Sequence, residues 1–241
     1  MILFFKAALD DWILSSSIYN AIHLEVGNNI NNVGLMMIDG DKVISLNAGH
    51  PDIEQNENLT IIAHGNNDGD FCDKDGNVMM SMTMLRDLLL TILPDNFTGT
   101  IRLRACYSGK NGIGSQKIYS MTHRIYELLR YSKPDFNVKV KGTNGPNVDY
   151  IDFNNIWHEL CVNPTMEDAA GNISRSLESP KFKSLRITYP TDLNTLYRES
   201  EKIAKETRSF FVEFAKSLSA QNCLLTANPY NYWSKDVEGQ M

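Results

Sequence analysis

The sequence predicts an α/β protein with a mostly parallel central sheet flanked by helices and a helical C-terminal extension. Three observations support this prediction. Apolar β-type runs alternate with helical patterns through the central third of the chain, and this alternation builds a parallel sheet with helices on its faces. Two of the runs end abruptly in His64 and Cys106, each with a glycine at the turn or just beyond it. A long amphipathic pattern at 192–219 predicts the C-terminal helix.

Composition narrows the function classes. The chain has 241 residues, of which 42% are hydrophobic and 22% are charged, as in an ordinary globular protein with a full core. A net charge of −6 argues against a general nucleic-acid binder, which is usually basic. The four cysteines are scattered without a Cys-x-x-Cys pair, which predicts reduced thiols rather than a disulfide scaffold. We expect no metal site, because the zinc-ligand residue types match no compact spacing: His64, Cys72, Cys106 and His123.

The first half of the chain predicts four strands and two helices. The strands are expected at residues 1–6, 34–39, 43–46 and 59–64. The first run is apolar but too short to span a membrane. The second and third form a hairpin around the turn residue Gly40. Helical spacing occurs at 10–26 and 81–93, and a polar loop is expected at 65–77.

The second half continues the alternation and then becomes helical. Strands are expected at 101–105, 137–142, 148–153 and 185–189, and helices at 115–132 and 192–219. Residues 156–160 are predicted as a helix or turn. We assign residues 1–190 to one α/β domain that carries the candidate site. Residues 191–241 are assigned to a helical extension that packs on the same domain, with Phe210, Phe211 and Phe214 against the body or a partner.

His64 and Cys106 are the candidate catalytic residues. If their strands are parallel neighbours, both side chains emerge at one carboxyl edge of the sheet, where open α/β folds place their sites. A thiol and an imidazole there supply a nucleophile and its acid–base partner. Each also has a structural alternative, since a lone cysteine is most often a small buried hydrophobe. Gly65 permits close approach to the main chain, so its amide and the Cys106 amide are expected to form an oxyanion hole. If the first turn of the following helix points toward the sulfur, its dipole is expected to favour a Cys106 thiolate modestly.

These two motifs resemble a known group of enzymes. A hydrophobic strand ending in His64-Gly65, then a helix, then a strand ending in Ala105-Cys106-x-x-Gly109 is similar to the caspase-fold cysteine peptidases. That group includes caspases, legumains, gingipains, clostripain and the self-processing cysteine protease domains of bacterial toxins. The toxin domains are the most similar, because the acidic loop after His-Gly and the single-chain layout match. The resemblance covers about residues 59–145.

The resemblance implies a cysteine endopeptidase that acts on a protein or peptide substrate. Cys106 would attack the peptide carbonyl, His64 would protonate the leaving amine, and the amides of Gly65 and Cys106 would hold the oxyanion. Some branches have a third, orienting residue. Asp39 is a candidate for it, although a turn residue of the hairpin is the simpler interpretation. The group binds substrate as an extra strand beside the strand that follows the cysteine's helix, which here implies Lys141, Gly142, Thr143 and Asn144.

Two further expectations concern ligands. Toxin relatives are activated by inositol hexakisphosphate, and the basic residues available for such an anion site are Arg102, Arg104, Lys139 and Lys141. The alternative is that the two arginines form ion pairs with acidic residues on a flanking helix, because unpaired arginines in a covered strand are costly. Asp68 and Asp70, in the loop after His64, either favour a basic substrate residue or belong to a solvated loop.

A second function class competes with the enzyme. The same fold would serve a non-catalytic caspase-like module that binds a protein partner through its cleft. For the enzyme, the toxin resemblance implies a virulence effector secreted into a host cell cytosol; a cytoplasmic location is the alternative. No nucleic acid, membrane span or cofactor is expected beyond the inositol phosphate.

Overall fold

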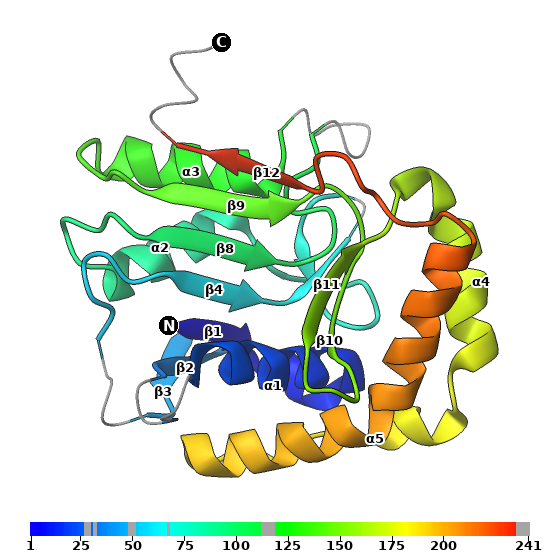
Figure 1. Cartoon of the computed structure of the whole chain (residues 1–241). Coiled ribbons are helices and arrows are strands. Elements are labelled where there is room, and N and C mark those ends of the chain that lie inside the picture. Colours follow the sequence, from blue (N-terminus) through cyan, green and yellow to red (C-terminus); the bar gives the residue numbers. More distant parts are fainter. Residues whose placement is uncertain (27–29, 31–32, 48–51, 67, 112–118, 235–241) are drawn as a thin grey trace.

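A computed structural model describes the chain except for residues 27–29, 31–32, 48–51, 67, 112–118 and 235–241. Its centre is a seven-stranded sheet with the order β12-β9-β8-β4-β1-β2-β3 (Figure 1). The strands are β1 (Ile2–Phe5), β2 (Leu35–Asp39), β3 (Lys42–Ser45), β4 (Leu59–Ile62), β8 (Thr100–Arg104), β9 (Lys139–Thr143) and β12 (Tyr230–Trp233). The inner strands are parallel, and β3 and β12 are antiparallel at the two edges. The predicted α/β class with a mostly parallel sheet is confirmed.

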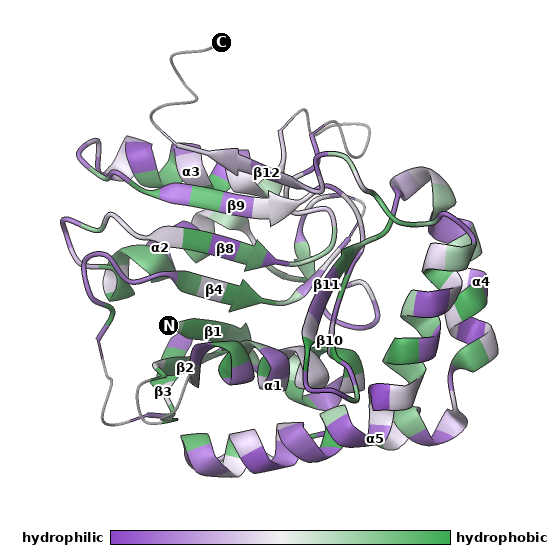
Figure 2. Ribbon diagram, viewed as in Figure 1, coloured by the Kyte–Doolittle hydropathy of each residue, from purple (hydrophilic) through white to green (hydrophobic). Residues whose placement is uncertain are grey.

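Helices cover both faces of this sheet. Helix α1 (Trp12–Val26) packs on one face, with α5 (Leu193–Ala220) against α1, and α2 (Met82–Ile92) and α3 (Met121–Ser132) pack on the other (Figure 1). A hydrophobic core lies on each face of the sheet, and β1 contributes side chains to both, since alternate side chains of a strand point to opposite faces. Figure 2 shows the central strands as largely hydrophobic, while α5 alternates between hydrophobic and hydrophilic residues. The pattern is that of a sheet buried between two helical layers.

Serine caps set the starts of the two helices near the site. The Ser81 hydroxyl accepts from the Met84 amide at α2, and the Ser120 hydroxyl accepts from the His123 amide at α3. Residues 115–118, where the second of these helices was expected to begin, lie outside the described residues. Strands β4 and β8 are parallel neighbours, with Ile62 opposite Arg104. The adjacency that the proposed dyad requires is therefore confirmed.

Two small sheets lie at the carboxyl ends of these strands. One contains β5 (His64–Gly65), β6 (Phe71–Cys72) and β7 (Val78–Met80), so the expected loop at 65–77 includes a strand. The other is the hairpin β10 (Asn147–Ile151) and β11 (Trp157–Cys161), which crosses in front of the strand ends (Figure 1). The prediction of a helix or turn at 156–160 is wrong. Each residue of β11 instead pairs with one of β10 across the hairpin.

The structure differs from the prediction at three further places. The helix expected at 10–26 starts at Trp12, after a 3₁₀ helix (Lys6–Asp10). Residues 185–189 form no strand; the Ile187 amide donates to the Leu9 carbonyl at 2.7 Å, outside any ladder of strand pairs. Helix α4 (Glu167–Leu177) was not predicted. Two shorter 3₁₀ helices complete the described elements, Pro164–Met166 and Pro180–Ser184.

The C-terminal part of the chain joins the body through aromatic packing and through the sheet. The Trp12 ring packs on Phe182, Phe210 and Phe211, with ring centroids 5.3, 5.1 and 5.5 Å away. Between α5 and residue 234, however, the described residues form no further helix and return to the sheet as β12 against β9. Trp233 of β12 stacks on the His123 ring at 3.7 Å. None of the helices in the described ranges combines the length and apolar character needed to cross a bilayer.

Candidate active site

His64 and Cys106 line one cavity. Strand β4 leads directly to His64, and Cys106 follows β8 by two residues. Because these strands are parallel neighbours, both side chains lie at the same sheet edge. The cavity has a volume of about 470 Å³, and its walls also include Asp11, Ile13, Gly65, Asn66, Cys72, Asp73, Lys74, Gly76, Tyr107, Pro146 and Glu167. The structure therefore brings the two candidate catalytic residues together.

A strained turn presents Cys106 to this cavity. The next residue, Tyr107, has φ of 61°, a left-handed conformation that is uncommon for a side chain of this size. Holding it costs on the order of 1–3 kcal/mol. The Tyr107 amide donates to the Gly145 carbonyl at 3.1 Å, and its phenol O–H donates to the Glu167 carboxylate. These two hydrogen bonds fix the turn that directs the thiol.

The thiol itself is protonated at rest. Burial raises the pKa of Cys106 to about 11, and the opposing hydrogen bond from the Asn147 amide is too weak to offset it. The Cys106 Sγ also lies 3.7 Å from Asn147 Oδ1. Desolvation therefore dominates the pKa of this thiol, and a contribution from the dipole of the following helix stays a prediction. A reaction at this sulfur needs a base.

Asp11 orients His64. His64 Nε2 lies 2.8 Å from Asp11 Oδ2, while Asp11 Oδ1 accepts from the Ile13 and Leu14 amides at 2.7 and 3.2 Å. Burial raises the pKa of Asp11, but the hydrogen bond and charge of His64 and the two amides outweigh it, so the pKa is lowered. Asp11 is therefore a carboxylate that accepts from Nε2–H. In the neutral imidazole, Nδ1 is then left as the acceptor.

Asp11 was not among the residues predicted from the sequence. Asp39, the orienting candidate predicted instead, forms an exposed pair with Lys6 at 2.8 Å and does not line the cavity. Asp11 follows the 3₁₀ helix (Lys6–Asp10) that continues from β1, and β1 lies beside β4 in the sheet. The available signal was an aspartate at the start of the first helix, a short segment after the first strand. Only the sheet order brings that strand next to the histidine strand.

Gly65 is required by a close approach of two main chains. A Cβ at this position would collide with the carbonyl oxygen of Cys106 and lie 3.1 Å from its amide nitrogen. Within the described part of the chain, no acceptor is found for the Cys106 N–H. An amide without an acceptor beside the thiol suits an oxyanion donor, so the predicted role of these amides stays consistent with the geometry.

The four residues predicted to bind substrate lie elsewhere. Strand β12 covers the outer edge of β9, with Tyr232 opposite Lys141, Asn231 opposite Gly142 and Tyr230 opposite Thr143. The Asn144 amide donates to the Pro229 carbonyl at 2.9 Å. None of the four lines the cavity that holds Cys106. While β12 is paired, a peptide has no free edge of β9 to join.

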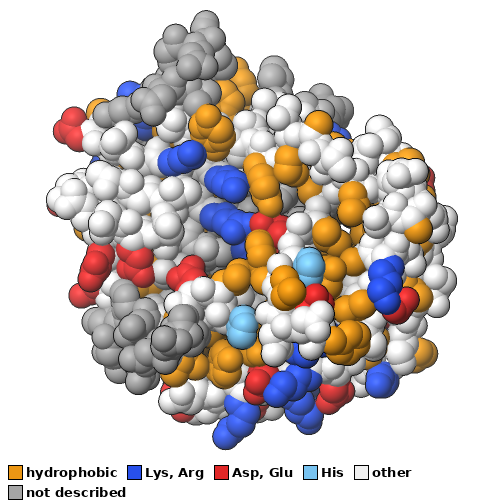
Figure 3. Space-filling view, in the orientation of Figure 1, with side chains coloured by type: hydrophobic (Ala, Val, Ile, Leu, Met, Phe, Trp, Pro, Cys, Tyr) orange, Lys and Arg blue, Asp and Glu red, His pale blue; other side chains and the backbone are white. Residues whose placement is uncertain are grey.

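The two arginines of β8 form ion pairs. Arg104 Nε donates to Asp149 Oδ2 at 3.0 Å in a buried pair, and Arg102 pairs with Glu159. The expected ion pairs are therefore confirmed, but their acidic partners lie on the β10–β11 hairpin and not on a flanking helix. Lys139 and Lys141 instead lie over the rings of Tyr232 and Tyr230, at 4.3 and 3.8 Å from their centroids. Figure 3 shows Lys and Arg side chains gathered over β9 and β8, next to acidic side chains.

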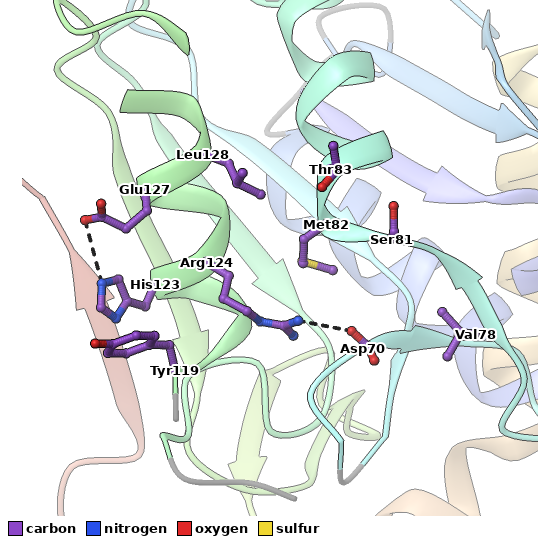
Figure 4. A pocket seen from close by; sticks show the side chains of 10 residues that line it. All are labelled: Asp70, Val78, Ser81, Met82, Thr83, Tyr119, His123, Arg124, Glu127 and Leu128. Carbon is purple, nitrogen blue, oxygen red and sulfur yellow. Dashed lines mark hydrogen bonds and ion pairs between the residues drawn. The ribbon is translucent and has the colours of Figure 1, made fainter. Parts of the chain in front are cut away.

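A larger cavity, of about 730 Å³, lies between the starts of α2 and α3 (Figure 4). Arg124 pairs there with Asp70 at 3.2 Å, and Glu127 lies 3.6 Å from His123. Asp70, which was a candidate for attracting a basic substrate, is therefore paired and lines this cavity instead. Neither His64 nor Cys106 lines it, so it offers no nucleophile from that pair. Among the described residues, no group of three or more His, Cys, Asp or Glu side chains is arranged to hold a metal ion.

No protein-family model and no curated protein matches this sequence.

Proposed function

We propose that this protein is a caspase-fold cysteine endopeptidase in which Cys106 is the nucleophile, His64 the acid–base residue and Asp11 the orienting carboxylate. The observation that carries the proposal is the shared cavity of Cys106 and His64, in which Asp11 binds one imidazole nitrogen and leaves the other as a base. The sheet supports the same fold, since the strands before the two residues are parallel neighbours.

The chemistry follows from these groups. His64 Nδ1 takes the Cys106 proton as the sulfur bonds to the carbonyl carbon, and the π electrons move to the carbonyl oxygen. The amides of Gly65 and Cys106 donate to that oxyanion. When the C–N bond breaks, the imidazolium gives its proton to the leaving amine and a thioester remains. Water, deprotonated by His64, then attacks the thioester and restores the thiol, releasing a carboxylic acid.

An anionic activator is a further part of the proposal. Arg102, Lys139 and Lys141 lie on neighbouring strands, and the pKa of Lys141 is lowered by burial and then by the charge of Arg102. Like charges held together favour a polyanion such as inositol hexakisphosphate. Arg102 is already paired with Glu159, however, and Arg104 on the same strand is paired with Asp149. We therefore propose that the polyanion stimulates peptide cleavage and that cleavage does not require it.

The proposed setting is a reducing cytosol, either the cell's own or that of a host cell entered by a secreted effector. All four cysteines are free thiols in the structure. Reduced thiols suit a cytosolic location, because disulfides persist mainly in oxidising compartments.

The test is a peptide-library cleavage profile of the wild type beside Cys106→Ala and His64→Ala, with and without inositol hexakisphosphate. We expect cleavage by the wild type alone, with His64→Ala reduced by about 10²–10⁴-fold. Cleavage by Cys106→Ala at the wild-type rate would overturn the mechanism. A folded wild type that binds peptides without cleaving any, with or without the polyanion, would instead support the non-catalytic binding module.

Asp11→Asn gives the sharpest single test of the orienting role. Asparagine caps a helix as well as aspartate does, so α1 keeps its start while the negative charge beside His64 is lost. We expect kcat/KM to fall by about 10²-fold or more, with the midpoint of thermal unfolding little changed. Unchanged turnover in this variant would exclude Asp11 from catalysis and leave a simple dyad.

A further inference from the structure

Glu167 is a carboxylate of the catalytic cavity for which the described residues provide no cationic partner. It is exposed, lines the cavity, and stands in the first turn of α4. Its neighbour is the phenol of Tyr107, which donates a hydrogen bond but brings no positive charge. Across the described ranges, no Lys, Arg or His forms a salt bridge with Glu167.

The other carboxylates of the cavity are already engaged. Asp11 binds His64 and two amides at the start of α1. Asp73 accepts from the Asp75 amide and from the amide and side chain of Asn77, so it is committed to its own turn. Lys74, the cation on the wall, is an exposed residue of the same turn. Glu167 accepts a single hydrogen bond, from Tyr107, among the described residues, so it has more capacity left for a ligand than Asp11 or Asp73.

Its place in the cavity of the nucleophile suits the substrate residue whose carbonyl is attacked. Tyr107 follows Cys106 directly, and its phenol binds the Glu167 carboxylate. The thiol and this carboxylate therefore line the same cavity. Ile13 and Pro146 add apolar wall to the same cavity. An apolar wall with an acid at its end fits the aliphatic stem and charged head of lysine or arginine.

We propose that Glu167 determines substrate specificity by binding a lysine or arginine side chain on the amino side of the scissile bond. The inference rests on the proposed function, because a scissile bond exists only if the protein is a peptidase. Recognition of the side chain can nevertheless be measured without turnover. It replaces the loop residues Asp68 and Asp70 as the source of a basic preference. Asp70 is paired with Arg124 and lines the other cavity.

The experiment compares two peptidyl chloromethyl ketones that are identical except for arginine or leucine next to the reactive group. The Cys106 sulfur bonds to the methylene carbon as chloride leaves, and intact-protein mass spectrometry follows the rate. We expect the wild type to react about 10- to 100-fold faster with the arginine reagent, the range typical of a hydrogen bond to a charged group. Cys106→Ala controls for alkylation at other residues.

Glu167→Gln and Asp168→Asn are the matched variants. Glutamine still accepts the Tyr107 hydrogen bond, so the turn at Cys106 is kept while the charge is lost. Asp168 is the next residue of α4, is exposed and does not line the cavity. We expect Glu167→Gln to lose the arginine preference, measured as the ratio of its rates with the arginine and leucine reagents. Asp168→Asn should keep the preference.

The outcomes separate the two proposals. Equal rates with both reagents in the wild type, or an arginine preference that survives Glu167→Gln, overturn the specificity role. A parallel loss of both rates in Glu167→Gln also overturns it, because it indicates a structural role for the residue. An arginine preference in a wild type that cleaves no arginyl peptide amide leaves the specificity inference intact and refutes the peptidase.

Discussion

The Cys106 thiol is a poor nucleophile until a base acts on it. Its pKa is raised to about 11 by burial, which leaves little thiolate near neutral pH. A resting ion pair between thiolate and imidazolium is therefore not what this site stabilises. His64, held by Asp11, has to take the proton during the attack. The consequence is a site that reacts slowly with simple thiol reagents in the absence of substrate.

We expect the rate of Cys106 alkylation by iodoacetamide to rise about tenfold per pH unit from about pH 6 to about pH 10, because the thiolate fraction rises so below the pKa. Mass spectrometry of the intact protein measures the rate. Cys106→Ala supplies the background from Cys72, Cys161 and Cys223, which are all buried. A rate that levels off below pH 7 would mean that a thiolate already exists at rest.

At the scale of elements, β12 is the least expected part of the fold. It closes the edge of the sheet beside β9 and places its two neighbouring aromatic residues on opposite faces. Trp233 is 6% exposed and stacks on His123 of α3, whereas Tyr232 is 46% exposed and lies over Lys139. One strand therefore joins the sheet to α3 through a single buried ring.

Replacing these two rings separately tests that role. Trp233→Ala should lower the free energy of unfolding by about 3–5 kcal/mol, the usual cost of truncating a buried aromatic residue. Tyr232→Ala should cost less than about 1 kcal/mol, because its ring is largely solvated. Urea unfolding measures both. Equal, small losses would show that β12 does not stabilise the sheet in solution.

Across the whole molecule, one buried ion pair joins the sheet to the β10–β11 hairpin, and a helix binds the main chain of the same hairpin. Arg104 of β8 binds the Asp149 carboxylate of β10, and Asn20 of α1 donates to the Asp149 carbonyl at 2.9 Å. Both charged side chains are 3% exposed. Breaking such a pair on one side leaves an uncompensated buried charge, which is more costly than replacing both partners.

A double-mutant cycle with Arg104→Met and Asp149→Leu tests this link. Each single variant should lose about 3–5 kcal/mol of unfolding free energy, and the double variant should recover most of that loss. The exposed pair of Lys6 and Asp39 is the control, with a coupling energy below about 1 kcal/mol expected. Additive losses for Arg104 and Asp149 would show that they do not act as a pair.

Much of the candidate site is predictable from local sequence. The runs before His64 and Cys106 are short, apolar and ended by glycine-containing turns, and a helical pattern separates them. A crossover helix between consecutive strands normally returns the chain to a parallel neighbour. The adjacency of β4 and β8, and the shared edge of their end residues, follow from that local pattern.

The remaining features depend on contacts between distant segments. Asp11 meets His64 because β1 lies beside β4. Glu167 lines the cavity because the β10–β11 hairpin places the start of α4 there, and the sequence pattern of that hairpin is weak. Strand β12 forms by pairing with the open edge of β9, and the four residues of β12 do not by themselves predict that pairing. The raised pKa of Cys106 is a property of burial. Periodicity and turn residues report local conformation, whereas strand order, burial and charge pairing arise only when the whole chain packs.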